Sequence, residues 1–456
     1  MVSVTEYVAP AFSTRGTYRR HEQSNMKFLF IHNRFPAQFR HIIDILVKDG
    51  HEIVFLCQYK REDMSSEGVR LIPVPRYLAS EKGKSQSHSV SRQLFHTGEA
   101  YGKKMLDLAR NGFVPDVVYA HPGWGGSLYV PDIFPSAAYV IYGEWFYTKG
   151  ENYHFFSKEK KSPVAFAANR HRNLYQLDAL RECDAVISPT AWQMSQYPTE
   201  YAAKFHVIHD GIDTDFFSPP PAEKRGEAST VQGVPLAGFP EIVTYATRGM
   251  EPYRGFPQFF QSIPRILAKR PHCHIVIMAN DEVHYSAPRA DGKSWGEAMR
   301  ESVPVDPERV HFLKFGSYEE YRTVLRSSTV HVYLTAPFVL SWSLLEAMSC
   351  GCCVVASSTP PVREVITHEV NGFLAPFWKS EVLAQTIIHA LEHRKSLERI
   401  RKNARQTIVR RFDLRTLLPA HLSLLMEAAR RRHWLRWAHE DGVPPLMEER
   451  PLADNP

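Results

Sequence analysis

Residues 27–57 read KFLFIHNRFPAQFRHIIDILVKDGHEIVFLC, in which two apolar runs flank an amphipathic one. A loop that contains Pro36 follows the first run. Residues 38–48 then carry apolar side chains at helical spacing, and Gly50 ends that pattern. The second run, 52–57, has the length of a buried strand. This strand–helix–strand order predicts a βαβ unit and hence a parallel sheet.

The rest of the chain continues this alternation. In the first half we expect strands at 116–120, 138–142 and 185–188 and a helix at 169–181. A second series begins at residue 242, with strands at 242–246, 274–278, 310–315, 330–334 and 352–356 and helices at 256–269, 318–327 and 343–349. Strands that alternate with helices are typical of Rossmann-like, doubly wound α/β domains.

The predicted organisation is therefore two Rossmann-like domains in tandem. We expect a flexible tail at 1–25, a first domain at 26–212, a linker at 213–240, a second domain at 241–415, and a C-terminal helix and tail at 416–456. The linker is assigned because Ser, Pro, Gly and Ala crowd this part of the chain without apolar periodicity. Such domains bind ligands in the cleft outside the carboxyl ends of their strands.

Composition narrows the class of protein. The chain has 456 residues, enough for two domains, and its 44% hydrophobic and 23% charged residues are ordinary for a globular protein. Six cysteines form no disulfide framework, and no signal peptide or apolar run of membrane-spanning length occurs, so we expect a cytoplasmic location. The net charge of +6 suits anionic ligands or the cytoplasmic face of a membrane and does not indicate nucleic acid. A basic stretch at 158–172 is either a lipid-facing surface or a solvated helix face.

The segment PFVLSWSLLEAMSCG, residues 337–351, carries the first candidate site. A strand ends at Leu334 and a helix begins near Ser341, so backbone N–H groups and the helix dipole would face the cleft and attract an anion. Glu346 lies about one turn further on in apolar surroundings, where a carboxylate needs hydrogen-bond donors. A ribose diol would supply two, and a salt bridge or neighbouring backbone groups are the alternative.

The segment YATRGMEPYRGF, residues 245–256, carries the second candidate site. Arg248 stands at the carboxyl end of the first strand of the second domain, and Arg254 stands just before the next helix. Two guanidinium groups placed there can converge on one diphosphate, because their planar forks match phosphate oxygens. Two solvated loop arginines are the alternative.

This order of motifs resembles the retaining glycosyltransferases of family 4, which share the GT-B fold. The resemblance lies in a strand, Arg-Gly, a basic residue with Gly, a helix, and Glu-Ala-Met-x-x-Gly about 100 residues later. Asp210-Gly211-Ile212-Asp213 and Asn371-Gly372-Phe373-Leu374 are similar to two further segments of that family. It implies two Rossmann-like domains that face a cleft, the first on the acceptor side and the second binding the sugar nucleotide, with C-terminal helices that cross back to the first domain.

The resemblance also implies roles for single residues. Arg248 and Arg254 would bind the diphosphate of the donor, and Glu346 would accept its ribose hydroxyls. The backbone at Ser341 and Trp342 would meet the distal phosphate.

The turn near Lys314 would contact the base. The chain departs from the family at three positions, with Phe338 in place of a Glu that touches the donor sugar, Ser341 in place of Gly, and Arg254 in place of Lys.

In the first domain, the loop at 32–38 stands where the family has a Gly-rich, phosphate-facing loop. Its last residues, Ala37 and Gln38, are candidates for a phosphate or acceptor loop. His121 follows a strand and precedes a pair of glycines, so it should reach the cleft. The resemblance implies that it contacts the donor sugar there or assists the departing phosphate; a buried histidine bonded to backbone is the alternative. Glu144 ends the next strand and could recognise acceptor hydroxyls.

The predicted reaction is transfer of a sugar, with retention, from a nucleoside diphosphate sugar to a glycan or lipid-linked acceptor, in polysaccharide or glycoconjugate biosynthesis. We assign catalysis to His121, Arg248 and Arg254, with no metal and no cofactor beyond the sugar nucleotide. The Asp213–Asp215 pair resembles a metal motif of another glycosyltransferase fold, but its position between the domains favours a capped turn. The alternatives are a sugar-nucleotide 2-epimerase and a catalytically silent nucleotide-binding partner; no Gly-x-Gly-x-x-Gly supports a nicotinamide oxidoreductase.

Overall fold

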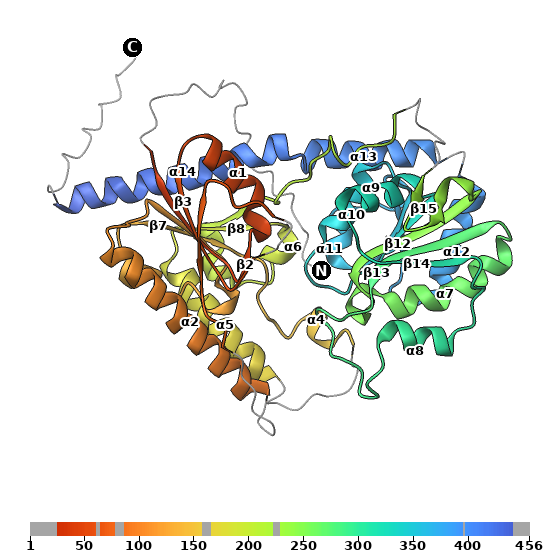
Figure 1. Ribbon diagram of the computed structural model, residues 1–456, viewed down its shortest axis with the longest axis horizontal. Helices are drawn as coiled ribbons and strands as arrows, with labels where there is room; N and C mark the ends of the chain where they lie inside the picture. The colour runs from red at the N-terminus through yellow and green to blue at the C-terminus, as the bar shows by residue number, and fades with distance from the viewer. Residues whose placement is uncertain are drawn as a thin grey trace, which may run out of the picture.

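A computed structural model describes residues 25–60, 64–77, 86–156, 166–221, 229–394 and 397–440. The predicted tail, except for its last residue, lies outside the described residues, as do 441–456, the middle of the predicted linker and most of the basic stretch at 158–172. Within the described ranges the chain forms two α/β units, each built on a parallel sheet (Figure 1).

The first unit contains a seven-stranded parallel sheet in the order β5-β3-β1-β6-β7-β8-β9. Its strands are β1 (Lys27–Ile31), β3 (Glu52–Cys57), β5 (Val69–Pro73), β6 (Val117–Ala120), β7 (Ala138–Tyr142), β8 (Ala185–Ser188) and β9 (Phe205–Val207). Ile31 pairs with both Leu56 and Ala120, so the carboxyl ends of β1, β3 and β6 meet at one edge. Helices cover both faces, which explains why the inner strands are continuous apolar runs rather than alternating ones.

The helices of the first unit are η1 (Ala37–Phe39), α1 (Arg40–Lys48), α2 (Gln86–Arg110), η2 (Pro122–Trp124), α3 (Val130–Ile133), α4 (Glu151–His154), α5 (Ala167–Glu182), α6 (Ala191–Met194) and η4 (Thr199–Lys204). A two-stranded sheet joins β2 (Arg34–Phe35) to β4 (Tyr59–Lys60). The helix α2, the longest of this unit, was not predicted from the sequence. Its interior contains Gly98 and Gly102, residues that usually mark turns. A Cβ on Gly102 would lie 2.7 Å from the Tyr129 ring, so glycine here permits close helix packing.

The second unit contains a six-stranded parallel sheet in the order β14-β13-β12-β15-β16-β17. Its strands are β12 (Glu241–Gly249), β13 (Cys273–Asn280), β14 (Val310–Leu313), β15 (Val330–Tyr333), β16 (Val354–Ser357) and β17 (Phe373–Ala375). Its helices are η7 (Pro252–Arg254), α7 (Phe256–Lys269), α8 (Trp295–Ser302), α9 (Tyr318–Ser327), α10 (Trp342–Ser349), α11 (Pro360–Arg363), α12 (Ser380–Glu392) and α13 (Glu398–Arg411).

The described parts of the segment between the sheets, residues 213–221 and 229–240, pack on the second unit. A short hairpin of β10 (Thr230–Val231) and β11 (Val234–Pro235) leads into η6 (Leu236–Gly238). Phe217, Val231 and Leu236 are buried in the core of the second unit. Asp213 caps a turn, since its Oδ1 accepts the N–H groups of Asp215 and Phe216 at 3.1 and 2.9 Å. The buried side chains of this segment are too widely spaced to produce a periodic pattern in the sequence.

The C-terminal helices cross back to the first unit, as predicted (Figure 1). After α13 the long helix α14 (Leu414–Glu440) packs Leu418, Leu422 and Leu425 into the core beneath β6 and β7. Ile212, in the outward crossing of the chain, exchanges backbone hydrogen bonds with Phe412 and Leu414 in the return crossing. The predicted architecture of two Rossmann-like units with a returning C-terminal helix is therefore confirmed. No helix in the part of the chain that the structure describes is long and apolar enough to cross a membrane.

Candidate active site between the two units

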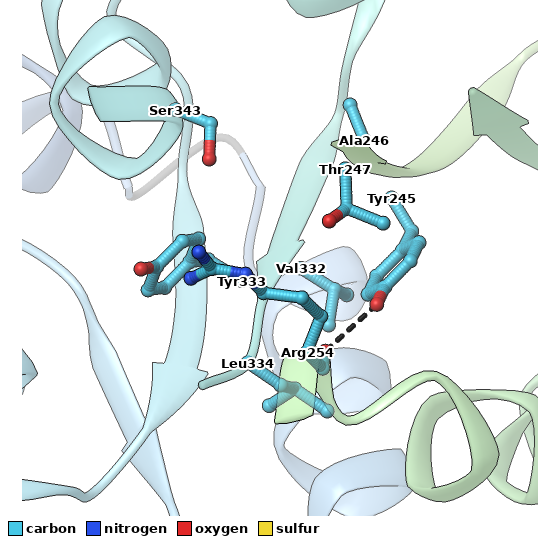
Figure 2. A pocket seen from close by; sticks show the side chains of 8 residues that line it. All are labelled: Tyr245, Ala246, Thr247, Arg254, Val332, Tyr333, Leu334 and Ser343. Atoms are coloured by element: carbon cyan, nitrogen blue, oxygen red, sulfur yellow. Dashed lines mark hydrogen bonds between the residues drawn. The ribbon is translucent and has the colours of Figure 1, made fainter. Parts of the chain in front are cut away.

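Side chains from two helix beginnings enclose a small pocket in the second unit (Figure 2). Thr247 lines it from the end of β12, Tyr333 from β15, Arg254 from η7 and Ser343 from the first turn of α10. The pocket measures about 10 Å³, which is room for one water molecule. The structure thus brings together the two predicted anion-binding elements, the turn before α7 and the beginning of α10.

Arg254 is held firmly at this pocket. Gly255, which follows it, has a φ of 66°, and a Cβ there would lie 2.5 Å from the Leu334 Cβ, so the chain turns tightly against the end of β15. The Arg254 carbonyl accepts a hydrogen bond from the Tyr245 hydroxyl at 2.7 Å. Its guanidinium extends toward Tyr333 (Figure 2) and, among the residues that the structure describes, donates one hydrogen bond, to the Thr335 Oγ1 at 3.3 Å. A guanidinium has five N–H donors, so most of them remain for a ligand.

Glu251, which was not among the predicted site residues, supports Arg254. Its buried carboxylate accepts three backbone N–H groups, from His284, Tyr285 and Ser286, at 2.8 to 3.1 Å. These bonds fix the loop that places the Tyr285 ring 5.1 Å from the Arg254 guanidinium carbon. The only signal in the sequence was an acidic residue between two Arg-Gly turns, which does not show which loop it holds.

Arg248 does not line the pocket. It lies in β12 within the shift in strand register between Ala246 and Gly249, and its side chain is exposed. Among the described residues no hydrogen bond or ion pair is made by its guanidinium. Burial lowers the pKa of the neighbouring His284, and the positive charge of Arg248 lowers it further. The Arg248 guanidinium is therefore free to move outside the pocket, whereas the Arg254 guanidinium is fixed inside it.

The beginning of α10 has the predicted cap. Ser341 precedes the helix in extended conformation, and its Oγ accepts the Ser343 N–H at 3.4 Å. The N–H of Ser341 is not free, since it donates to the Tyr333 hydroxyl at 3.0 Å. The backbone of Trp342 stands at the first helical position, and its indole Nε1 donates to Asp210 at 2.8 Å.

Glu346 lies in α10 with only 7% of its surface exposed. Burial raises the pKa of its carboxyl group to about 7, an effect that the nearby Tyr321 hydroxyl partly offsets. A carboxyl group with this pKa gains from hydroxyl donors, which stabilise its ionised form.

Lys314 is exposed beyond β14. Its backbone N–H and carbonyl are both bonded, at 3.0 Å each, to the side-chain amide of Gln232 in the β10–β11 hairpin. The hairpin thus covers the backbone of the turn that was predicted to contact the base.

On the first unit, three predicted residues form one hydrogen-bonded chain. The Nδ1 of His121 accepts the Gly123 N–H at 3.1 Å, so its Nε2 carries the proton and donates to the Glu144 Oε2 at 3.1 Å. The other oxygen of Glu144 accepts from the Gln38 Nε2 at 3.3 Å. His121 is buried against the Trp124 ring at 4.1 Å. The end of β6, the end of β7 and the loop before α1 are thereby joined.

The loop before α1 adopts a glycine-like conformation without glycine. Ala37 has a φ of 50°, in the left-handed region that side chains rarely occupy. His32, at the start of the loop, is buried 5.2 Å from the His121 ring, and burial lowers its pKa well below the usual value. Its Nδ1 accepts the Arg34 N–H, and its Nε2 has no hydrogen-bond partner within the described ranges. His32 was not among the predicted site residues, because a histidine after a strand carries no distinguishing pattern.

Aromatic and polar contacts close the gap between the units around Phe338. Its ring packs on Trp145 of the first unit at 4.7 Å and on Tyr285 of the second at 5.2 Å. The neighbouring Pro337 carbonyl accepts from Asn152 of α4 at 2.6 Å. Phe338 therefore lies between the two units in a hydrophobic cluster rather than offering a carboxylate.

Two family models match the chain in succession. The model described as Glycosyl transferase family 4 group matches residues 49–217, and the model described as Glycosyl transferases group 1 matches residues 240–407. Together they span most of the chain, one on each unit.

Individual proteins agree with these matches. The D-inositol 3-phosphate glycosyltransferase of Jonesia denitrificans is 21% identical over 317 residues, which make up 67% of this chain and 70% of that protein. Sucrose-phosphate synthase from Thermosynechococcus elongatus superposes with a TM-score of 0.65 at 15% identity, over 90% of this chain and 100% of its own. Anabaena HepE in complex with UDP-glucose gives a TM-score of 0.63 at 16% identity, over 88% and 100%.

Proposed function

The chain belongs to the glycosyltransferases of family 4 and group 1, and from that premise we propose that it is a retaining, metal-independent enzyme whose acceptor is a glycan or lipid-linked sugar. The donor is a nucleoside diphosphate sugar, and the reaction serves polysaccharide or glycoconjugate assembly.

The observation that carries this proposal is the pocket shared by Arg254 and Ser343. A guanidinium and the N-terminus of a helix both attract anionic oxygens, and here they face the same space. Positive groups fixed before the reaction stabilise the charge that develops on a leaving diphosphate at no cost of reorganisation. Arg254 is fixed by Tyr245, Thr335 and the Tyr285 ring, so it meets that condition.

Arg248 and Glu346 complete the donor site in this proposal. The exposed guanidinium of Arg248 folds over the diphosphate from the edge of the pocket. It thereby exchanges its contacts with water for hydrogen bonds to phosphate oxygens. Glu346 accepts the ribose hydroxyls, which compensate a carboxylate that burial otherwise disfavours. The backbone N–H of Trp342 faces the distal phosphate, while Ser341 caps α10 and donates its own N–H to Tyr333. The turn at Lys314 lies beside the base.

The acceptor side is formed by His121, Glu144 and the loop at Ala37 and Gln38. Glu144 is held by two side chains, so its oxygens present a fixed direction to acceptor hydroxyls. The acceptor oxygen forms the new bond to the anomeric carbon while the bond from that carbon to the diphosphate breaks. The acceptor proton passes to the leaving phosphate oxygen on the same face, so no protein nucleophile is needed. His121 takes part through its Nε2, which holds Glu144 in place beside the acceptor.

A donor panel tests the proposal. Purified protein is incubated with UDP, GDP, ADP and dTDP and with their glucose or mannose derivatives, and UDP-glucose is tried first because HepE was solved with it. We expect one nucleotide to raise the melting temperature and its sugar form to be slowly hydrolysed without acceptor. Arg254→Ala should abolish the shift. Arg300→Ala, which removes an arginine paired with Asp281, serves as the control.

The outcomes separate the alternatives. Absence of any shift with every nucleotide overturns the donor site, and turnover that a chelator abolishes overturns the metal-independent reaction. Uptake of solvent deuterium at the sugar would instead indicate epimerisation, and binding without hydrolysis or transfer would indicate a silent partner.

A further inference from the structure

We propose that Asp210 is a positioning residue that holds the donor-side helix α10 to the acceptor-side strand β7. This inference rests on the proposed function, because it concerns the distance between the two halves of that site. Asp210 lies in neither half, since it belongs to the segment that crosses from the first unit to the second.

The geometry is a link through a single atom. The Oδ2 of Asp210 accepts a hydrogen bond from the Tyr142 hydroxyl at 3.0 Å and another from the Trp342 indole Nε1 at 2.8 Å. Tyr142 is the last residue of β7 and stands two positions before Glu144. Trp342 is the first residue of α10, next to its cap Ser341. One oxygen therefore connects the acceptor-binding end of one sheet to the phosphate-facing end of the other.

The position of Asp210 is itself fixed by the return crossing. The His209 carbonyl lies 3.0 Å from the Nε2 of His421 in α14. Gly211 has a φ of 87°, and a Cβ there would lie 2.6 Å from the Leu414 side chain, so the backbone on both sides of Asp210 is packed on α14. Because the backbone around Asp210 is held on α14, its carboxylate fixes the position of Trp342 relative to Tyr142.

The hydrogen bonds are costly to lose. Tyr142 is buried, so its hydroxyl has no water to replace Asp210. Burial raises the pKa of Asp210 to about 7, and the bonds from Trp342 and Tyr142 oppose that rise. An asparagine at this position would keep one oxygen that can accept both bonds, and an alanine would keep neither.

The test compares Asp210→Asn with Asp210→Ala. The affinity for UDP, measured by calorimetry, should stay within about twofold of the wild type in both variants. The reason is that the residues proposed to bind the phosphates all belong to the second unit. The kcat of Asp210→Ala should fall by about tenfold or more, since a misplacement of about 1 Å between reacting groups can cost about 100-fold. The kcat of Asp210→Asn should stay within about threefold of the wild type.

Two further variants keep the proposal falsifiable if Asp210→Ala folds poorly. Tyr142→Phe and Trp342→Phe each break one of the two bonds in series, so each should lower kcat by a similar factor and the double variant should be no worse. Thr244→Val is the control, because it also removes a buried hydroxyl hydrogen bond, to His331, but entirely inside the second unit. It should lower the melting temperature and leave kcat unchanged.

Unchanged kcat in Asp210→Ala overturns the proposal, as do lost UDP affinity in that variant or multiplicative effects of the two aromatic substitutions. If the wild type itself binds no nucleotide, the proposed function fails instead. The link is then decided by small-angle scattering, where Asp210→Ala should have a larger radius of gyration than the wild type and Asp210→Asn, and equal radii refute it.

Discussion

His121 and Glu144 lie 3.1 Å apart, Nε2 to Oε2, at the ends of two adjacent parallel strands. The histidine is buried, whereas 29% of the glutamate side chain is exposed. The pair thus has a fixed inner member and an outer member that can reach a substrate.

Replacement of Glu144 by glutamine should therefore weaken acceptor binding more than donor binding. The amide keeps an oxygen for the His121 proton but loses the charge that strengthens hydrogen bonds to hydroxyl groups. We expect the KM for acceptor to rise by about tenfold and the KM for donor to change little, as measured by initial rates with each substrate varied in turn. A donor KM that rises equally would contradict an acceptor role.

Arg248→Ala and Arg254→Lys should have different effects, because Arg248 is exposed outside the pocket and Arg254 is fixed inside it. The Arg248 guanidinium is exposed and makes no hydrogen bond or ion pair among the described residues, so its loss should raise the donor KM and leave the melting temperature unchanged. Arg254→Lys keeps the charge but cannot form a planar fork, so kcat/KM should fall by about 10-fold to 100-fold. Equal effects of the two substitutions on both stability and turnover would show that the assignment is wrong.

Glu251→Gln should affect both stability and turnover. Its carboxylate accepts three backbone N–H groups, and a neutral amide accepts fewer and weaker bonds, so the free energy of unfolding should fall by about 1–3 kcal/mol. The loop with Tyr285 would loosen, and kcat should fall with it. Glu297→Gln, which alters an exposed capping box on α8, is the control for loss of a carboxylate and should leave kcat unchanged.

The parts of this molecule that could be predicted from the sequence follow from local physics. The strands at 27–31 and 52–57 are buried on both faces, so their composition alone identifies them. Arg254 and the beginning of α10 could be predicted to meet because parallel strands end at a common edge. The α2 helix was missed because its packing contacts require glycines inside it.

Other features depend on contacts that no sequence period encodes. Gln38 and Glu144 are 106 residues apart, and Asp210 and Trp342 are 132 apart. Which loop Glu251 holds, and that Gln232 covers the Lys314 backbone, are likewise decided only when the elements are packed. Phe338 was recognised as unusual, but its partner Trp145 lies on the other unit.

The pH dependence of Glu346 provides the last prediction. Burial raises its pKa to about 7 in the folded protein, against an ordinary value of 4.5. Between these values the folded state binds the proton and the unfolded state does not, so the free energy of unfolding falls as the pH rises through this window. Glu346→Gln stays neutral, so its stability relative to wild type should increase from about pH 5 to about pH 8, as measured by urea unfolding.

Donor binding should show the opposite trend, because only the ionised carboxylate accepts both ribose hydroxyls well. We expect the wild-type donor KM to fall as the pH rises from about 6 to about 8, and the Glu346→Gln profile to be flatter. Asp210 adds the same sign to the stability profile, so the difference between the two proteins, rather than either curve alone, isolates Glu346. Parallel profiles of wild type and variant would mean that Glu346 neither titrates in this range nor binds the donor.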